Sequence, residues 1–389
     1  MTDWSGAPRT RNNLRRRVLE ELRRTGFDRT SGGIVSSESF TKDEIRALHA
    51  RQRADLLARE HDFVNKWQDR VVEEFANGDE VDPTRISPRI VRVRTDEQAA
   101  LFRYTTLHWS VPVSRGYGRR TRFLVMDRQN DRLIGIFALG DPVYNLTARD
   151  QLIGWSIEQR NARLYNVLDA FVLGAVPPYR QLLGGKLIAM VALSDTTREI
   201  VKRKYDGQMT KILGEVKQPR PVLITTTSAL GRSSIYNRVK FRDDLLYHSV
   251  GYTRGFGHFQ FSEQLFRALL EFLSNDGGVP GYSYGQGPNW RIRTLRVALK
   301  RLDLDPELIH HGIRREVFLA PLARKWKEYL CGEVERPSWY RLNLDEMADF
   351  FRTRWALPRS ERDPSFRDVR RDDMALSKPR LRDSRGRRA

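Results

Sequence analysis

A short glycine-containing loop is the best candidate in this sequence for binding a phosphate. The apolar run from Asn166 to Leu173 predicts a strand, and the loop after it holds Gln181-x-x-Gly184-Gly185 ahead of a segment that predicts a helix. Glycine lets the backbone come close to an anion, and the first N–H groups of a helix lack intrahelical partners. The order strand, loop, helix therefore indicates an anion site. Glycines at such a corner can also serve the turn alone, and that alternative stays open.

A second segment extends the pattern toward an enzyme fold. The β-branched run at residues 221–227 predicts another strand, and the chain after it reaches Ile235-Tyr236 and then Phe241. This order of strands, glycine turn and tyrosine-bearing helix resembles the acetyltransferase fold of the GNAT superfamily. The resemblance implies that Tyr236 is the general acid toward a leaving thiolate. It also implies that the pyrophosphate of acetyl-CoA, or of another acyl-CoA, binds at Gln181, Leu183, Gly184, Gly185 and Lys186.

Two positions depart from the pattern of that superfamily. Lys186 stands where a second Gly or Ala is usual, and Lys240 replaces the glycine before Phe241. The first lysine either obstructs the phosphates or adds a charge that binds them. The alternative for Ile235-Tyr236 is a purely structural role in the hydrophobic core. The site that binds acyl-CoA in the superfamily would then be a surface that binds nucleic acid or a partner protein.

A second resemblance covers far more of the chain, approximately residues 85–335. Seven segments in order resemble the DruA family, the small component of the Druantia anti-phage defence system. They lie at residues 115–120, 134–142, 148–155, 183–186, 225–236, 285–290 and 311–318. The resemblance implies a role in phage defence beside a large helicase-like partner. Related domains occur in transposase-like proteins, so a transposition-linked DNA-binding module is a further alternative.

The composition points to an anionic partner. The chain has 389 residues and a net charge of +20, and 57 of its 69 basic residues are Arg. Arginine matches phosphate and base edges well, although a GC-rich genome would also favour it. No apolar run approaches the roughly 20 residues of a membrane-spanning helix. The basic N-terminus does not resemble a signal peptide, and a single cysteine, Cys331, fits a reducing compartment. We expect a cytoplasmic protein that meets DNA or RNA.

Most of the excess charge lies in three windows without acidic residues. The stretches between Glu97 and Asp127, between Glu215 and Asp243, and between Asp276 and Asp303 carry +5, +6 and +5. An ordinary solvated face mixes both signs, so these windows predict contact with nucleic acid. The aromatic residues of the third window could stack on bases, or could form a packed corner. The predicted contact residues are Arg115, Arg119, Arg120, Arg232, Arg238, Tyr284, Trp290, Arg291, Arg293 and Arg296.

Other catalytic signals are weak. His310-His311 and the single Cys331 lack the spacing of metal ligands, so no metal site is predicted. Asp141 and Asp150 are candidate carboxylates, but no third acid stands at a nuclease-like spacing. The sequence holds no Walker-type loop, so ATPase chemistry would come from a partner.

The elements that must position these residues predict an α+β fold with a mixed-sheet, GNAT-like core. Apolar runs at 122–127 and 132–139 predict a hairpin, and residues 313–330 predict a helix. We expect four parts: a helical N-terminal extension at 1–90, the core at 91–275, a C-terminal helical part at 276–358 and a disordered, charged tail at 359–389.

Overall fold

The structure is a computed structural model, and it describes residues 11–24, 40–113, 118–210, 214–255, 257–275 and 290–377. The chain divides into two compact units. The helical unit comprises residues 1–54, 229–232 and 252–315, and the sheet unit comprises residues 55–228, 233–251 and 316–389. The predicted boundaries near residues 90 and 275 therefore do not match this division, because both units are assembled from separated segments.

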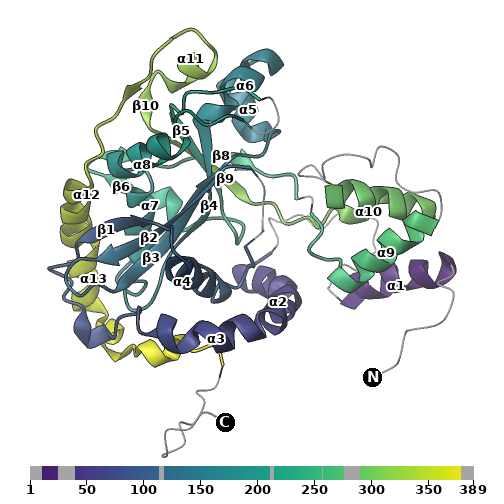
Figure 1. The fold of residues 1–389 in the computed structure, drawn as a ribbon, viewed down its shortest axis with the longest axis horizontal. Coiled ribbons are helices and arrows are strands. Elements are labelled where there is room, and N and C mark those ends of the chain that lie inside the picture. The colour runs from purple at the N-terminus through teal and green to yellow at the C-terminus, as the bar shows by residue number, and fades with distance from the viewer. Residues whose placement is uncertain are drawn as a thin grey trace, which may run out of the picture. The chain divides into compact units, whose positions relative to one another are not determined.

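A seven-stranded mixed sheet forms the sheet unit (Figure 1). Its order is β1-β2-β3-β4-β5-β9-β8. β1 to β4 are antiparallel neighbours, β4 and β5 run parallel, and β9 is antiparallel to β5. In this order, β1 spans Pro88–Arg92, β2 Arg120–Asp127, β3 Leu133–Gly140, β4 Val167–Ala175, β5 Leu223–Thr227, β9 Glu316–Pro321 and β8 His248–Tyr252. The mixed α+β class and the β2–β3 hairpin are confirmed.

Alternate residues of the central strands face two different apolar clusters, as the pleat requires. Phe123 and Phe137 pack with the helices α7 (Gly184–Val191) and α8 (Asp195–Tyr205). Leu124 and Ile136 pack with α3 (His61–Val72) and α4 (Asp96–Leu107). Two helical layers therefore cover the sheet.

The helix predicted at 313–330 is wrong. Glu316–Pro321 is the strand β9, paired with β5, and only α11 (Trp326–Leu330) is helical in that range. The run Val-Phe-Leu-Ala is buried on both sides of the strand. A strand covered on both faces shows no alternation of apolar and polar residues, so its pattern cannot be told from a buried helix.

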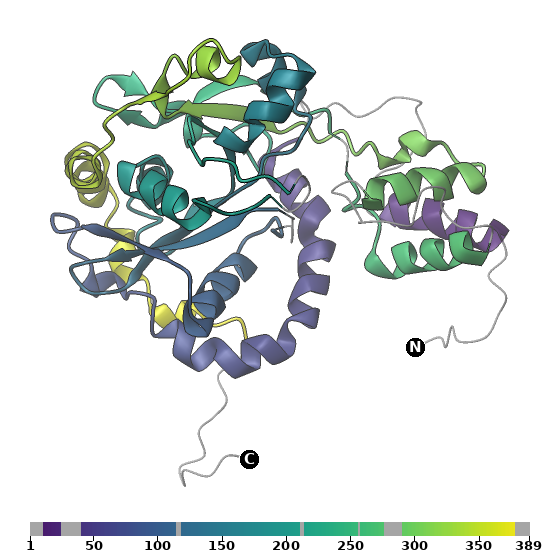
Figure 2. The ribbon, with the colours of Figure 1, turned by 45° about the horizontal axis from the view of Figure 1, so that its top comes forward.

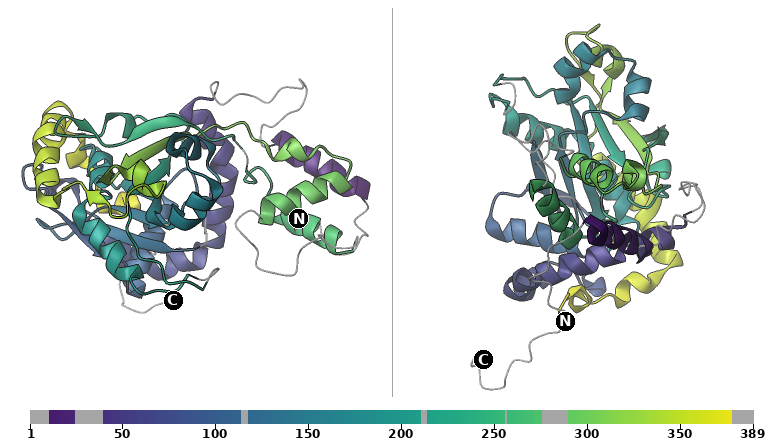
Figure 3. Two further views of the ribbon diagram at one scale, coloured as in Figure 1. Left: turned by 90° about the horizontal axis from the view of Figure 1, so that it is seen from above. Right: turned by 90° about the vertical axis from the view of Figure 1, so that its right-hand side faces the viewer.

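Short elements complete the sheet unit. The connection from β3 to β4 contains α5 (Thr147–Ile153) and α6 (Ile157–Arg163). Two small two-stranded antiparallel sheets pair β6 (Lys240–Phe241) with β7 (Asp244–Leu245), and β10 (Ala323–Arg324) with β11 (Ser338–Trp339). The C-terminal part contributes α12 (Leu344–Phe351), a π-helix at Arg352–Ala356 and α13 (Leu357–Arg362). These C-terminal helices (yellow) lie against the sheet unit (Figure 3).

The tail predicted as disordered from residue 359 is folded as far as residue 377. Two 3-10 helices, Pro364–Asp368 and Arg371–Met374, bury Phe366 and Met374 in the two apolar clusters of the sheet. Gly78 donates its N–H to the carbonyl of Val369, and a Cβ on Gly78 would collide with backbone of this segment. Spaced apolar anchors within a charged sequence hold the segment. Residues 378–389 lie outside the described residues.

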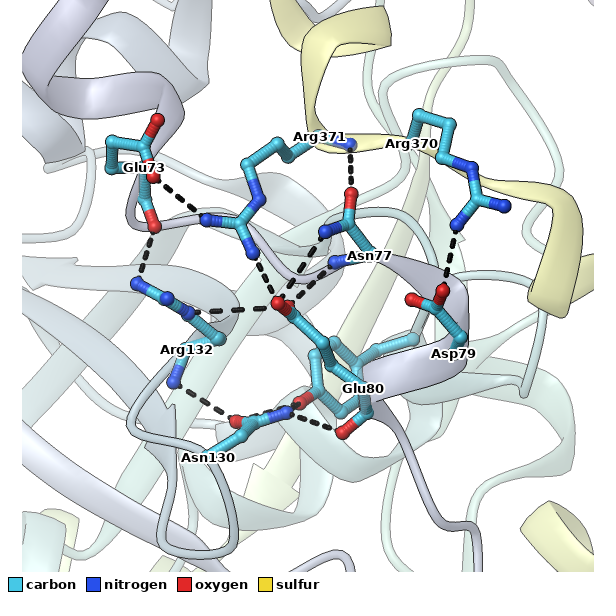
Figure 4. Close-up of polar contacts among 9 residues, drawn as sticks. Glu73, Asn77, Asp79, Glu80, Asn130, Arg132, Arg370 and Arg371 are labelled. Carbon is cyan, nitrogen blue, oxygen red and sulfur yellow. Dashed lines mark hydrogen bonds and ion pairs between the residues drawn. The ribbon is translucent and has the colours of Figure 1, made fainter.

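Charged contacts also hold this C-terminal segment (Figure 4). Arg371 pairs with Glu73 and with Glu80, and Arg370 pairs with Asp79 at 2.9 Å. We call residues 364–377 the C-terminal strap. Tyr104 on α4 extends the attachment, because its hydroxyl lies 2.9 Å from the carbonyl of Met374 and accepts the N–H of Leu376. The strap is therefore an integral part of the sheet unit.

In the helical unit, α1 (Arg11–Arg24), α9 (Glu263–Asn275) and α10 (Trp290–Arg301) share one apolar core (Figure 2). Leu14, Val18 and Leu22 form the apolar stripe of α1 and are buried here. Arg15 donates to the carbonyl of Asp303 at 3.1 Å, at the C-terminal end of α10. Residues 1–90 are thus divided between the two units, and α1 packs with helices some 250 residues away in sequence.

The helix α2 (Lys42–Arg59) spans the boundary between the two units, which falls after Ala54. A capping box joins Thr41 and Glu44 at its start. Within the described ranges, no helix combines the length and the apolar character needed to cross a membrane.

Candidate functional site

The parallel strands β4 and β5 stay paired over only three residues. Asp169 and Thr225 are the last paired positions, although β4 continues to Ala175 and β5 to Thr227. The hydroxyl of Thr225 donates a 2.8 Å hydrogen bond to Oδ1 of Asp169. Just beyond, the hydroxyl of Thr226 donates to the carbonyl of Ala170 at 2.9 Å. Polar groups therefore line the point where the two strands separate.

Asp169 is the ionisable group at this point, and the sequence analysis missed it. Burial raises the pKa of Asp169 to about 6, against the opposing effects of the Thr225 hydrogen bond and the charges of Arg149 and Arg120. A carboxylate with this pKa is ionised at neutral pH yet basic enough to accept a proton. The signal was present: Asp169 is the only charged residue in the apolar run from Val167 to Ala175.

Tyr236 lies near the same point, but not on the predicted helix. It begins a three-residue 3-10 helix, Tyr236–Arg238, and its backbone N–H donates to the hydroxyl of Ser233. Its ring packs on Tyr247 and Phe318 at 5.1 and 5.2 Å between centroids. Burial raises the pKa of Tyr236 to about 12, with a hydrogen bond to Thr226 opposing the shift. The phenol is thus protonated at neutral pH and able to donate.

The glycine turn does precede a helix, as predicted. Leu183 adopts a left-handed conformation, with φ of 62°, and α7 begins at Gly184. A Cβ on Gly184 would lie 2.6 Å from the carbonyl oxygen of Tyr179, so backbone packing requires this glycine. A Cβ on Gly185 would meet only the flexible end of Ile235, at 3.2 Å. Gly185 is therefore the open position of the turn.

Two N–H groups at the start of α7 already have partners. Gly184 donates to Tyr179 at 2.8 Å, and Lys186 donates to Leu183 at 2.9 Å. The backbone of Gln181 is engaged too, because its carbonyl accepts from Arg359 at 3.1 Å. The backbone of this turn thus offers an anion fewer donors than the sequence pattern indicates.

Cationic side chains surround the same turn. The amine of Lys186 lies 4.6 Å from the centre of the Trp355 ring. Burial lowers the pKa of Lys186, and the charges of Arg354 and Arg238 lower it further. Arg238 and Arg354 are exposed and come from two other elements, the 3-10 helix after β5 and the π-helix. Like charges gathered in this way are stabilised by an anionic ligand.

The predicted nucleic-acid contacts in the first window are partly used inside the protein. Arg119 donates to Asp141 and to the carbonyl of Tyr165, both at 2.7 Å. Arg120 lies 3.9 Å from the centre of the Phe171 ring. Arg115 falls outside the described residues. Arg119 thus has a structural role in joining β2, β3 and the start of β4.

The predicted contacts in the helical unit fall into two groups. Trp290 packs edge-on against Phe266, and Arg291 pairs with Glu263 at 2.9 Å while covering the same Phe266 ring. Arg293 is exposed on α10, Arg296 lies 3.8 Å from the carboxylate of Glu307, and Arg232 is exposed. Tyr284 lies outside the described residues. Arg232, Arg293 and Arg296 are therefore the exposed cations of the predicted set in this unit, and Arg296 of these lies beside an acid.

The candidate carboxylates Asp141 and Asp150 serve the fold. Asp141 holds Arg119, and Asp150 accepts from the fully buried Arg149 at 2.8 Å and from the Trp155 indole at 3.2 Å. Within the part of the chain that the structure describes, no group of three or more His, Cys, Asp or Glu side chains could hold a metal ion.

Comparisons with known proteins point to one family. The family model described as Druantia protein DruA matches residues 39–332 of this chain. A relative from Escherichia coli (strain UMEA 4076-1), Druantia protein DruA, is 43% identical over 358 residues. The match covers 91% of this chain and 89% of the relative. No solved structure matches the chain.

Proposed function

Since the chain belongs to the DruA family, a component of the Druantia anti-phage defence system, we propose that it binds nucleic acid in that role and transfers an acyl group from acyl-CoA to an amine. The observation that carries this proposal is the separation of β4 and β5 after Asp169 and Thr225, with Tyr236 close by. This sheet order, with one parallel pair that opens, resembles the GNAT fold. The likeness is one of fold, so the residues at the opening must carry the chemistry.

The residues fit the transfer as follows. An acyl-CoA would supply the acyl group as a thioester. Asp169 would accept the proton that the attacking amine loses as the new C–N bond forms, and Tyr236 would protonate the sulfur as the C–S bond breaks. The pKa of Asp169, about 6, and that of Tyr236, about 12, suit these opposite roles at neutral pH. The acceptor amine belongs to a nucleobase or a protein.

The cations around α7 support binding of the CoA pyrophosphate. Gly185 is open, and Lys186, Arg238 and Arg354 stand near one another. Of the two alternatives for Lys186, the proposal takes the one in which its charge helps to bind the phosphates, although its amine lies over the Trp355 ring. The side chains would therefore do more of the phosphate binding than the backbone N–H groups, two of which are already used.

The nucleic-acid part of the proposal rests on the exposed cations. Arg232 and Arg293 in the helical unit, and Arg238 in the sheet unit, are exposed members of windows without acidic residues. Exposed arginines away from acids bind phosphates through counterion release, whatever the base sequence. A large helicase-like protein is the partner that we propose within the defence system.

The experiment is a calorimetric titration of the full chain with acetyl-CoA and with CoA. We expect saturable binding that Gly185→Trp abolishes, because an indole there would fill the open side of the turn. The control is Leu152→Trp, which places the same ring on the exposed face of α5. Absence of CoA binding, or equal binding by Gly185→Trp, would sink the acyl-transfer proposal.

One observation favours a second candidate function, a module that binds nucleic acid or a partner without catalysis. Since Gly184 and Lys186 already donate their N–H groups within the protein, an anion at the start of α7 would be bound mainly by side chains. Such a module would bind DNA in a salt-dependent way and would fail to bind CoA. A transposition-linked module makes the same two predictions, and a neighbouring transposase or helicase gene distinguishes the two settings.

A further inference from the structure

The sheet unit contains a pocket that shares only Gln181 with the predicted acyl-CoA site. It measures about 320 Å³ and has three walls. The turn after α4 contributes Trp109, the chain after β4 contributes Pro177, Arg180 and Gln181, and the C-terminal strap contributes Asp373. Sites for small molecules in proteins begin at roughly this volume, about 300 Å³. The pocket is therefore large enough for a ligand and not only for water.

Trp109 offers a stacking surface in this pocket. Its indole lies against β4, and a Cβ on Gly174 would come within 3.0 Å of the ring, so the glycine makes room for it. The side chain is only partly buried, because it also borders the pocket. Stacking on the part of the indole that borders the pocket favours a planar, aromatic ligand.

The polar groups in the pocket would be satisfied by a ligand that has hydrogen-bond donors and a negative charge. The side-chain oxygen of Gln181 is buried and has no hydrogen-bond partner among the described residues. An unsatisfied buried acceptor is costly, and a ligand N–H that reached it would remove that cost. The guanidinium of Arg180 is exposed and has no acid partner within the described ranges. Among the described residues, the Asp373 carboxylate accepts one hydrogen bond, from the backbone N–H of Arg370 at 3.0 Å, so it can accept another.

We infer that this pocket binds a single nucleotide, with its base on Trp109 and its phosphate at Arg180. A nucleobase combines a flat ring with N–H donors, and glutamine is a common partner of adenine. The phosphate supplies the anion that Arg180 lacks. The inference deepens the nucleic-acid part of the proposed function and rests on it, since the nucleotide is one unstacked unit of a bound strand.

The C-terminal strap makes this pocket dependent on contacts outside it. Asp373 and Met374 belong to the strap wall, and the neighbouring Arg371 fastens that wall to Glu73 and Glu80 (Figure 4). Arg371 does not line the pocket. Its loss should therefore weaken nucleotide binding indirectly, by letting one wall move.

The test is a calorimetric titration of the full chain with each of the four nucleoside 5′-monophosphates. We expect at least one to bind, and Trp109→Ala to weaken that binding roughly tenfold or more. Trp109→Phe should restore most of the affinity, because the phenyl ring still stacks. Trp326→Ala, on α11 and in another apolar cluster, is the matched control. Arg180→Ser should weaken binding of the nucleotide more than binding of the corresponding nucleoside, which lacks the phosphate.

The outcomes separate this inference from the proposed function. If no monophosphate binds, or if Trp109→Ala and wild type bind equally, the pocket is not a nucleotide site. Oligonucleotide binding that Arg293→Ser weakens would then leave the proposed function standing. If neither monophosphates nor oligonucleotides bind, both fail together.

Discussion

The hydroxyl of Thr225 and Oδ1 of Asp169 lie 2.8 Å apart, across the last paired residues of β4 and β5. This hydrogen bond fixes one carboxylate oxygen at the point where the strands separate. The other oxygen is free of any described hydrogen bond. Asp169 is thereby oriented by the sheet itself, and a rigid strand positions a reactive group better than a loop does.

Asp169→Asn should remove acyl transfer and yet stabilise the protein. Because the folded-state pKa of Asp169 is raised to about 6, the stability it contributes is present below the ordinary pKa of 3.8 and is lost as the pH rises through 6. The neutral amide avoids that loss. We expect a gain of up to about 3 kcal/mol in the free energy of unfolding at pH 8, and a smaller one at pH 5.

Urea unfolding at both pH values measures this difference. The control is Asp131→Asn, whose carboxylate lies exposed in the β2–β3 turn. An equal gain at pH 5 and pH 8 would contradict the assignment of the raised pKa to Asp169.

Arg371→Ala should loosen the C-terminal strap. Its guanidinium is mostly buried and pairs with both Glu73 and Glu80, so the substitution leaves two carboxylates without this donor. We expect a loss of about 1–3 kcal/mol in the free energy of unfolding and faster proteolysis of the strap. Limited proteolysis followed by mass spectrometry locates the new cleavage.

Arg370→Ala is the matched control for this change. Arg370 pairs with Asp79, and both side chains are more than half exposed, so the expected cost is at most about 1 kcal/mol. Equal effects of the two substitutions would show that Arg371 does not anchor the strap.

Arg149→Met should be among the most destabilising single changes in the sheet unit. The guanidinium is fully buried and donates to Asp150 and to the carbonyls of Val143 and Tyr144. Removing the guanidinium leaves these acceptors without their donor, which should lower the free energy of unfolding by about 3–5 kcal/mol. Chemical denaturation measures the loss, and Arg203→Met on the exposed side of α8 should change stability by less than about 0.5 kcal/mol.

Arg293→Ser should weaken binding of DNA without weakening the fold. Arg293 is exposed on α10, so its loss should reduce the slope of log affinity against log salt by about one. Arg291→Ser is the contrast, because Arg291 pairs with Glu263 and covers Phe266. Arg291→Ser should lower the melting temperature and should have little effect on the affinity for DNA. Unchanged affinity of Arg293→Ser over a salt series would remove α10 from the interface.

The sequence predicted the elements that carry their own local signals. The β2–β3 hairpin, the strands around Asn166–Leu173 and residues 221–227, and the helix after Gly184 follow apolar runs and turn residues, and the structure has them. β9 was missed because a doubly covered strand has no alternation. The folded strap was missed because its few anchors, such as Phe366, are spaced among charges.

The candidate site was harder to predict, because it depends on which strands are neighbours. Asp169 and Thr225 are 56 residues apart, and only the parallel pairing brings them together. The charges were visible in the sequence, but their partners were not. Arg119 and Arg291 are occupied by acids that lie outside the windows in which these arginines were counted.

The composition of the helical unit has a consequence for synthesis on the ribosome. The helix α1, which comes first among the described residues, has its apolar stripe covered by α9 and α10, which end at residue 301. Leu14, Val18 and Leu22 therefore lack their native cover until the residues of α9 and α10 have been translated. Nascent chains with unsatisfied apolar surface attract chaperones and each other. The timing of translation through the segment between β8 and β9 should thus govern how much of this protein reaches its native form.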